Sequence, residues 1–172
     1  QLALMLRLPI YLDSIGTILI GAWMGPFYGM LPNMISGVLM GFTTDIYSLY
    51  FAPVGMITGF MAGIAAKQMH GLVFEKQVKK LQIIAGALFI TIPGTMVSSV
   101  INAVLFGGVT SSGSSILVQI LSRTPLGLTG SIFAVQIFTD YLDRVISLAL
   151  VVMVLQMLPF SMKTAFQKAE RK

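Results

Sequence analysis

The feature that most constrains this sequence is a series of long apolar segments. The clearest one, residues 81–106, contains no charged side chain, and a helix needs about 20 apolar residues to cross a bilayer. Charged residues make up 10% of the chain and hydrophobic residues 56%, whereas a soluble domain has about 25% charged residues. A soluble domain of this size could not bury so much apolar surface in one core. The sequence therefore predicts an all-α integral membrane protein and excludes soluble, disordered and nucleic-acid-binding classes.

Prolines, glycines and polar residues divide the chain into six predicted helices, which form a single transmembrane domain over residues 1–172. The first helix ends near Pro9, and we expect the chain to begin inside it. The other helices are expected at 14–24, 27–42, 53–69, 81–106 and 131–160. The second and third are short for a full crossing, so they require longer neighbours or local bilayer thinning. Connections are expected at 43–52, 70–80, 107–115 and 124–130, with a short interfacial helix at 116–122 and a kink at Pro93.

The basic residues are distributed unevenly over the predicted connections. Eight of them flank the 70–80 connection or follow the last helix: Lys67, Lys76, Lys79, Lys80, Lys163, Lys168, Arg171 and Lys172. The other three are Arg7, Arg123 and Arg144. Because cytoplasmic loops carry the excess of Lys and Arg, this distribution predicts that both termini are cytoplasmic. The segments near 8–14, 43–53 and 107–130 then face outward.

Small residues recur at every fourth position in three predicted helices. Gly55, Gly59 and Gly63 form the longest series, and the pairs Gly37/Gly41 and Gly21/Gly25 repeat the spacing. This spacing lets helix backbones approach closely in lipid. It fits packing inside the bundle or a docking face for another membrane subunit.

The composition excludes several kinds of chemistry. The chain contains no cysteine and one histidine, His70, so it offers neither a thiolate nor a clustered imidazole metal site. It has no GxxxxGK[ST] phosphate loop, and His70 lies at the predicted cytoplasmic edge, away from the other polar residues. We therefore expect no enzymatic activity, no cofactor and no metal.

Polar residues gather near the predicted outer ends of the helices and define a candidate substrate-binding site. Its expected members are Asp13, Tyr47, Asn102, Gln136, Asp140 and Arg144. Ser98, Ser99 and Thr17 could add neutral hydrogen bonds. Asp140 and Arg144 are spaced i,i+4 and can pair on one helix face, so a structural ion pair or interfacial charges in water are the alternative interpretation.

The predicted outer level also suits a flat or partly anionic ligand. The second, fourth and sixth helices begin there, with free N–H groups and partial positive charge. Five aromatic residues lie at the same level: Tyr11, Tyr47, Tyr50, Phe51 and Tyr141. They fit an interfacial aromatic belt or a stacking surface for a heteroaromatic ring.

Two stretches resemble the S components of energy-coupling factor (ECF) transporters. LPIYLDSIGTILIGAWMGPFYGMLPNMISGVLMGF (8–42) resembles the start of that family, and DRVISLALVVMVLQMLP (143–159) resembles its final helix. The resemblance implies a six-helix membrane protein of the prokaryotic cytoplasmic membrane that captures a vitamin outside the cell. It also implies three partners, a transmembrane scaffold subunit and two ATPases, and release of the substrate by toppling within the membrane.

The few cations on the predicted outer side argue against a strongly anionic substrate. We therefore favour a small, neutral, hydroxylated ring such as pyridoxine or hydroxymethylpyrimidine, with riboflavin or thiamine as alternatives. Two other classes fit the same sequence: a membrane sensor or input module, and a structural subunit of a membrane complex. A co-purifying ATPase pair favours the transporter, and a ligand-dependent signal without ATPases favours the sensor.

Overall fold

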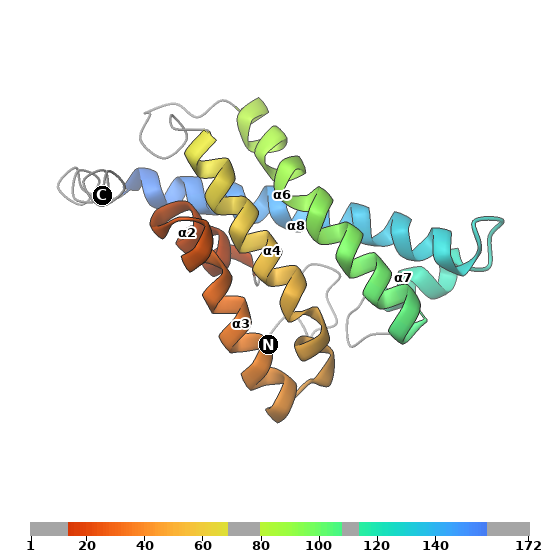
Figure 1. Cartoon of the computed structure of the whole chain (residues 1–172). Coiled ribbons are helices and arrows are strands. Elements are labelled where there is room, and N and C mark those ends of the chain that lie inside the picture. Colours follow the sequence, from red (N-terminus) through yellow and green to blue (C-terminus); the bar gives the residue numbers. More distant parts are fainter. Residues whose placement is uncertain (1–13, 69–79, 108–113, 158–172) are drawn as a thin grey trace.

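The structure is a computed structural model that describes residues 14–68, 80–107 and 114–157. Within these ranges every regular element is helical, so the all-α prediction is confirmed there (Figure 1). The elements are α2 (Ser14–Met24), α3 (Pro26–Thr43), α4 (Ile46–Gln68), α6 (Lys80–Ile101), the π-helical segment η1 (Asn102–Phe106), α7 (Ser114–Leu121) and α8 (Gly127–Met157). The predicted first helix, most of the 70–80 connection and the basic tail lie outside the described residues.

The break between α2 and α3 is where the sequence predicts it. Gly25 has a φ of 100°, a backbone conformation that a side chain would strain, so the chain turns there. Pro26 then opens α3 because its fixed φ suits the first helical turn and its missing N–H would have no partner there. The short helix predicted at 116–122 is also present, as α7, and its interfacial position stays a prediction.

Two predicted helix starts are wrong. The fourth helix begins at Ile46 rather than at residue 53, because the Asp45 carboxylate supports its first turn. Asp45 Oδ1 accepts a hydrogen bond from the Tyr47 N–H at 3.3 Å, and Oδ2 accepts one from the Ser48 hydroxyl at 3.2 Å. Pro53 therefore lies inside α4, and most of the predicted 43–52 connection is helical. The last helix likewise begins at Gly127, not at residue 131.

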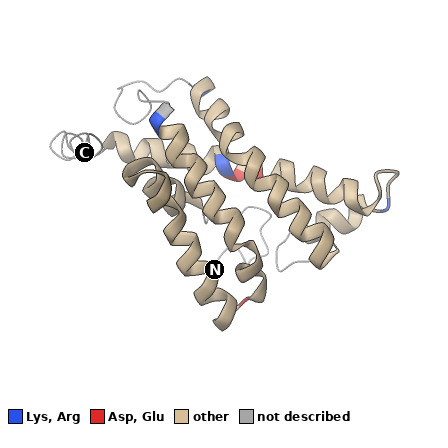
Figure 2. Ribbon diagram, in the orientation of Figure 1, with Lys and Arg blue, Asp and Glu red and all other residues tan. Residues whose placement is uncertain are grey.

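The helices form two groups, one around α4 and the other around α8. In one group α4 packs against α2 and α3, and in the other α8 packs against α6 and α7. Contacts of α4 with α6 and of α2 with α8 join the groups. Figure 1 shows α4 and α6 side by side, with α8 running across them. Figure 2 shows that the helices carry few charges along their lengths, apart from a group on α8.

The glycine series of α4 packs inside the protein. An added Cβ at Gly59 would overlap the backbone carbonyl of Gly29 in α3, and one at Gly63 would overlap the backbone of Pro26. An added Cβ at Gly21 would lie 2.5 Å from the carbonyl oxygen of Gly59. The α2, α3 and α4 backbones therefore touch directly, and this face serves internal packing, the first of the two predicted interpretations.

The surface and the interior have an unusual division of side-chain types. Among the described residues, thirty-two large hydrophobic side chains are exposed, including Phe27, Leu81 and Met157 at 74–80%. The buried residues include fourteen polar or charged side chains, mostly Ser and Thr, beside thirteen hydrophobic ones. Two helical segments, Ile46–Lys67 and Lys80–Phe106, are long and apolar enough to cross a membrane.

Candidate functional site

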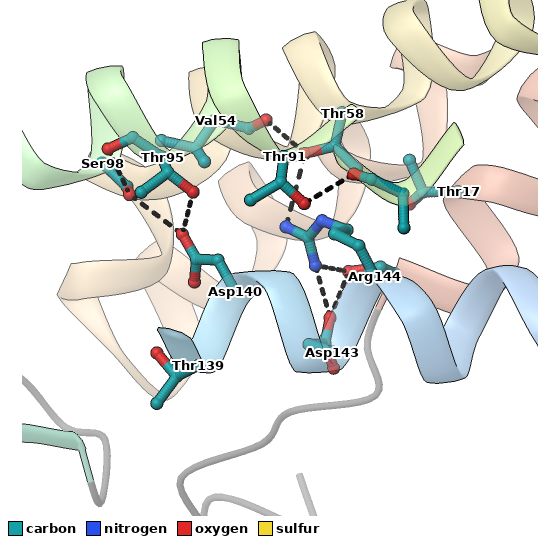
Figure 3. A network of polar contacts seen from close by, with 12 residues as sticks. Thr17, Val54, Thr58, Thr91, Thr95, Ser98, Thr139, Asp140, Asp143 and Arg144 are labelled. Atoms are coloured by element: carbon teal, nitrogen blue, oxygen red, sulfur yellow. Dashed lines mark hydrogen bonds and ion pairs between the residues drawn. The ribbon is translucent and has the colours of Figure 1, made fainter. Parts of the chain in front are cut away.

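Polar side chains of Thr95 and Ser98 on α6 contact Gln136 and Asp140 on α8. We call these four residues, together with Asn102 at the start of η1, the α6–α8 seam. The Thr95 hydroxyl donates to Asp140 Oδ2 at 2.8 Å. The Ser98 hydroxyl lies 2.7 Å from Gln136 Oε1 and 3.3 Å from Asp140 Oδ2. Figure 3 shows Thr95 and Ser98 pointing from α6 toward Asp140 on α8. The seam thus holds a carboxylate between two otherwise apolar helices.

The seam continues from α6 into η1, where a buried amide has unused hydrogen-bonding capacity. Asn102, one turn beyond Ser98, is 2% exposed, and its Oδ1 has no hydrogen-bond partner among the described residues. Ser99, three residues before Asn102, is also buried, and its Oγ has no hydrogen-bond partner among the described residues. A buried polar atom without a hydrogen-bond partner lowers the stability of the folded protein by about 1–3 kcal/mol. A ligand that supplied the missing hydrogen bond would remove this cost, so Asn102 is a candidate ligand contact.

Asn102 also begins the π-helical segment η1, whose last residue is Phe106. The Phe106 ring lies among three rings from the start of α4, with centroid distances of 4.8 Å to Tyr47, 5.4 Å to Tyr50 and 6.0 Å to Phe51. The wider turn of a π-helix changes the register of the side chains that follow it. In this chain it joins the polar seam to an aromatic cluster.

A second polar cluster surrounds Arg144 and connects three helices. Its guanidinium donates to Asp143 on α8 and to the Ser14 hydroxyl on α2, and Nη2 lies 3.4 Å from Thr58 Oγ1 on α4. The side chains of Arg144 and Asp143 are 11% and 4% exposed. Figure 3 shows Arg144 rising from α8 toward Thr58, with the Asp143 carboxylate on the other side of its guanidinium.

The predicted ion pair between Asp140 and Arg144 is therefore wrong. Arg144 pairs with Asp143, and Asp140 accepts hydroxyl hydrogen bonds from α6 instead. Helical spacing allows the i,i+4 pair, but Ser14 and Thr58 draw the guanidinium toward α2 and α4. The three charged residues also lie near the middle of the 31-residue α8 rather than at its end.

The structure brings together some of the predicted site residues and separates others. Asn102, Gln136 and Asp140 lie in the α6–α8 seam, and Tyr47 joins the aromatic cluster beside it. Arg144 belongs to the second cluster, and Asp13 lies outside the described residues.

Sequence reasoning missed Thr95 of the seam, together with Ser14 and Thr58. For Thr95 a signal exists, since Thr91, Thr95, Ser98 and Asn102 follow one another at helical spacings of three and four. Ser14 and Thr58 carry no such signal, because they are recruited from distant helices. No group of three His, Cys, Asp or Glu residues that could hold a metal ion occurs in the described part of the chain.

The described residues define an all-helical protein with an apolar surface and a polar seam between two helices. No known family model, curated protein or solved structure matches the chain.

Proposed function

We propose that this chain is an integral membrane protein built as a six-helix bundle with both termini in the cytoplasm. The exposed Phe, Leu, Ile and Met side chains would contact lipid tails. Because lipid tails are apolar, the hydrophobic effect does not favour burying these side chains inside the protein. Buried Ser and Thr hydroxyls, together with direct glycine contacts such as Gly29 against Gly59, are typical of helix packing in bilayers. Backbone carbonyls accept several of these hydroxyl protons; for example, Thr91 donates to the Ala87 carbonyl at 2.7 Å.

Within that class, the proposed role is substrate capture for an ECF-type importer. The observation that carries this proposal is the α6–α8 seam, because polar side chains inside apolar helices usually mark a ligand or ion pathway. The resemblance of segments 8–42 and 143–159 to S components supports the same role. A scaffold membrane subunit and two ATPases would supply the energy.

The proposed substrate is a small water-soluble vitamin or precursor with a heteroaromatic ring. The seam offers Asp140, Gln136 and Asn102 as hydrogen-bonding groups, and the rings around Phe106 offer an apolar neighbour for a flat molecule. This combination of a few polar groups and aromatic contacts is typical of small-molecule sites. Binding at such a site requires no chemical step by the protein.

The experiment that tests the proposal is purification of the intact chain from membranes of its own host. A captured vitamin should be released on denaturation and be identifiable by mass spectrometry, and a scaffold subunit with two ATPases should co-purify. A ligand-dependent signal without ATPases would instead favour a sensor module. Purification with large membrane partners, without a small molecule or ATPases, would favour a structural subunit.

A further inference from the structure

The hydrogen bonds of the α6–α8 seam contain more acceptors than donors. Ser98 has one hydroxyl proton, yet three acceptors lie within its reach: Gln136 Oε1 at 2.7 Å, the Thr95 carbonyl at 3.2 Å and Asp140 Oδ2 at 3.3 Å. The Thr95 hydroxyl proton goes to Asp140 Oδ2. A carboxylate can only accept when ionised, whereas the Asn102 and Gln136 amides can turn to present either an oxygen or an NH₂ group.

Asp140 forms no ion pair within the described residues, although the guanidinium charge of Arg144 is near enough to act on it. The guanidinium of Arg144, one turn further along α8, is taken up by Asp143, Ser14 and Thr58. Both printed bonds to Asp140 reach Oδ2, and its Oδ1 accepts no hydrogen bond from the described residues. Two hydroxyl contacts and a nearby guanidinium compensate this carboxylate only in part, so a partner with positive charge or N–H donors would stabilise it further.

We propose that Asp140 Oδ1 anchors a positively charged, N–H-bearing group of a small heteroaromatic base, such as a protonated amine or ring nitrogen. The ligand N–H donates to Oδ1, while Thr95 and Ser98 hold the carboxylate from its other oxygen. The Asn102 amide, one turn beyond Ser98, provides a second polar contact whose sense adapts to the ligand. This inference rests on the proposed capture function and narrows the substrate to basic rings, excluding carboxylates and phosphates.

A matched charge series tests the proposal on the intact purified chain. The probes are 3-(aminomethyl)pyridine, 3-(hydroxymethyl)pyridine and nicotinate, which place a cationic, a neutral and an anionic group at the same ring position. Calorimetric titration should give the tightest binding for the amine and the weakest for nicotinate. Hydrogen bonds to a charged group are the strong ones, so we expect Asp140→Asn to weaken amine binding about ten- to a hundredfold.

Control variants separate recognition from folding. Asp140→Asn keeps an acceptor for Thr95 and Ser98, so its melting temperature should stay close to that of the wild type. Asp140→Glu keeps the charge and should retain part of the preference for the amine. Asp45→Asn removes a negative charge outside the seam but keeps a side-chain oxygen for the Tyr47 N–H, so it should leave binding of all three probes unchanged.

Several results would overturn the proposal. One is that nicotinate binds as tightly as the amine or more tightly, and another is that Asp140→Asn keeps the wild-type preference for the amine. A third is that the amine does not bind at millimolar concentration. A fourth is that sodium or potassium ions stabilise the protein and the amine adds nothing to this effect. Mass spectrometry of the released molecule separates this failure from failure of the capture function. A released anionic vitamin with co-purified ATPases would overturn the inference and support capture. Absence of both a small molecule and ATPases would count against the capture function itself.

Discussion

Replacing Gly59 with alanine tests whether the backbones of α3 and α4 touch. The added Cβ would overlap the Gly29 carbonyl and lie 2.8 Å from Thr17 Cγ2. The carbonyl is part of the α3 backbone and cannot rotate away, so the helices must separate. Overpacking of this kind costs about 1–3 kcal/mol, and the better helix preference of alanine returns at most about 1 kcal/mol.

We therefore expect Gly59→Ala to lose about 2 kcal/mol of unfolding free energy, which corresponds to a drop of about 4–8 °C in melting temperature for a chain of this size. Thermal unfolding of the purified protein in one detergent measures the shift. The matched control is Gly130→Ala in α8, where the added Cβ would lie 3.5 Å from Leu126, an ordinary contact. This control should be neutral or slightly stabilising.

A double-mutant cycle with Gly29→Ala sharpens the test. An added Cβ at Gly29 would lie 2.5 Å from the Gly59 carbonyl oxygen, so the two substitutions disturb one contact. Their effects should be less than additive, because the first separation of the helices already makes room for the second methyl group. Wild-type stability for Gly59→Ala, or strict additivity of the pair, would refute direct backbone packing.

Three further predictions concern the topology and the two clusters. Cysteines placed at Lys79 and Lys168 should resist an impermeant thiol reagent in intact cells, and labelling of either would refute the proposed orientation. Arg144→Ala should lower the unfolding free energy by about 3–5 kcal/mol because the buried Asp143 carboxylate loses its positively charged partner; unchanged stability would mean that the cluster holds no helices together. Phe106→Ala should lower the unfolding free energy by about 2 kcal/mol because three ring contacts are lost. Phe89→Ala, at an exposed position of α6, is the control. An equal loss in both variants would show that ring packing at Phe106 is not the cause.

Local signals predicted the fold well where one residue dominates the backbone. Gly25 and Pro26 set the boundary of α2 and α3 as expected, because positive φ and a fixed proline φ act within one or two residues. The same reasoning misplaced the start of α4, since Pro53 is acceptable both at a helix start and inside a helix packed by neighbours. The competing support from Asp45 decides between these two positions.

The candidate site was harder to predict because its contacts cross between helices. Composition and position singled out Asn102, Gln136 and Asp140; Gln136 and Asp140 meet at Ser98, and Asn102 lies buried one turn beyond it. The partner of Arg144 was missed, because spacing within one helix cannot reveal which hydroxyls α2 and α4 bring to the guanidinium. That choice depends on the packing of segments 86–130 residues apart.

The Arg144 cluster has a consequence for the order in which the chain assembles during synthesis. Ser14 and Arg144 are 130 residues apart, and ribosomes add about 5–20 residues per second. Arg144 is therefore synthesised roughly 7–26 s after Ser14, and α2 has no contact with its guanidinium before then. The glycine contacts of α2 with α3 and α4 need no later segment, so this trio can form first. When α8 follows, Arg144 joins it to α2 and α4 through Ser14 and Thr58.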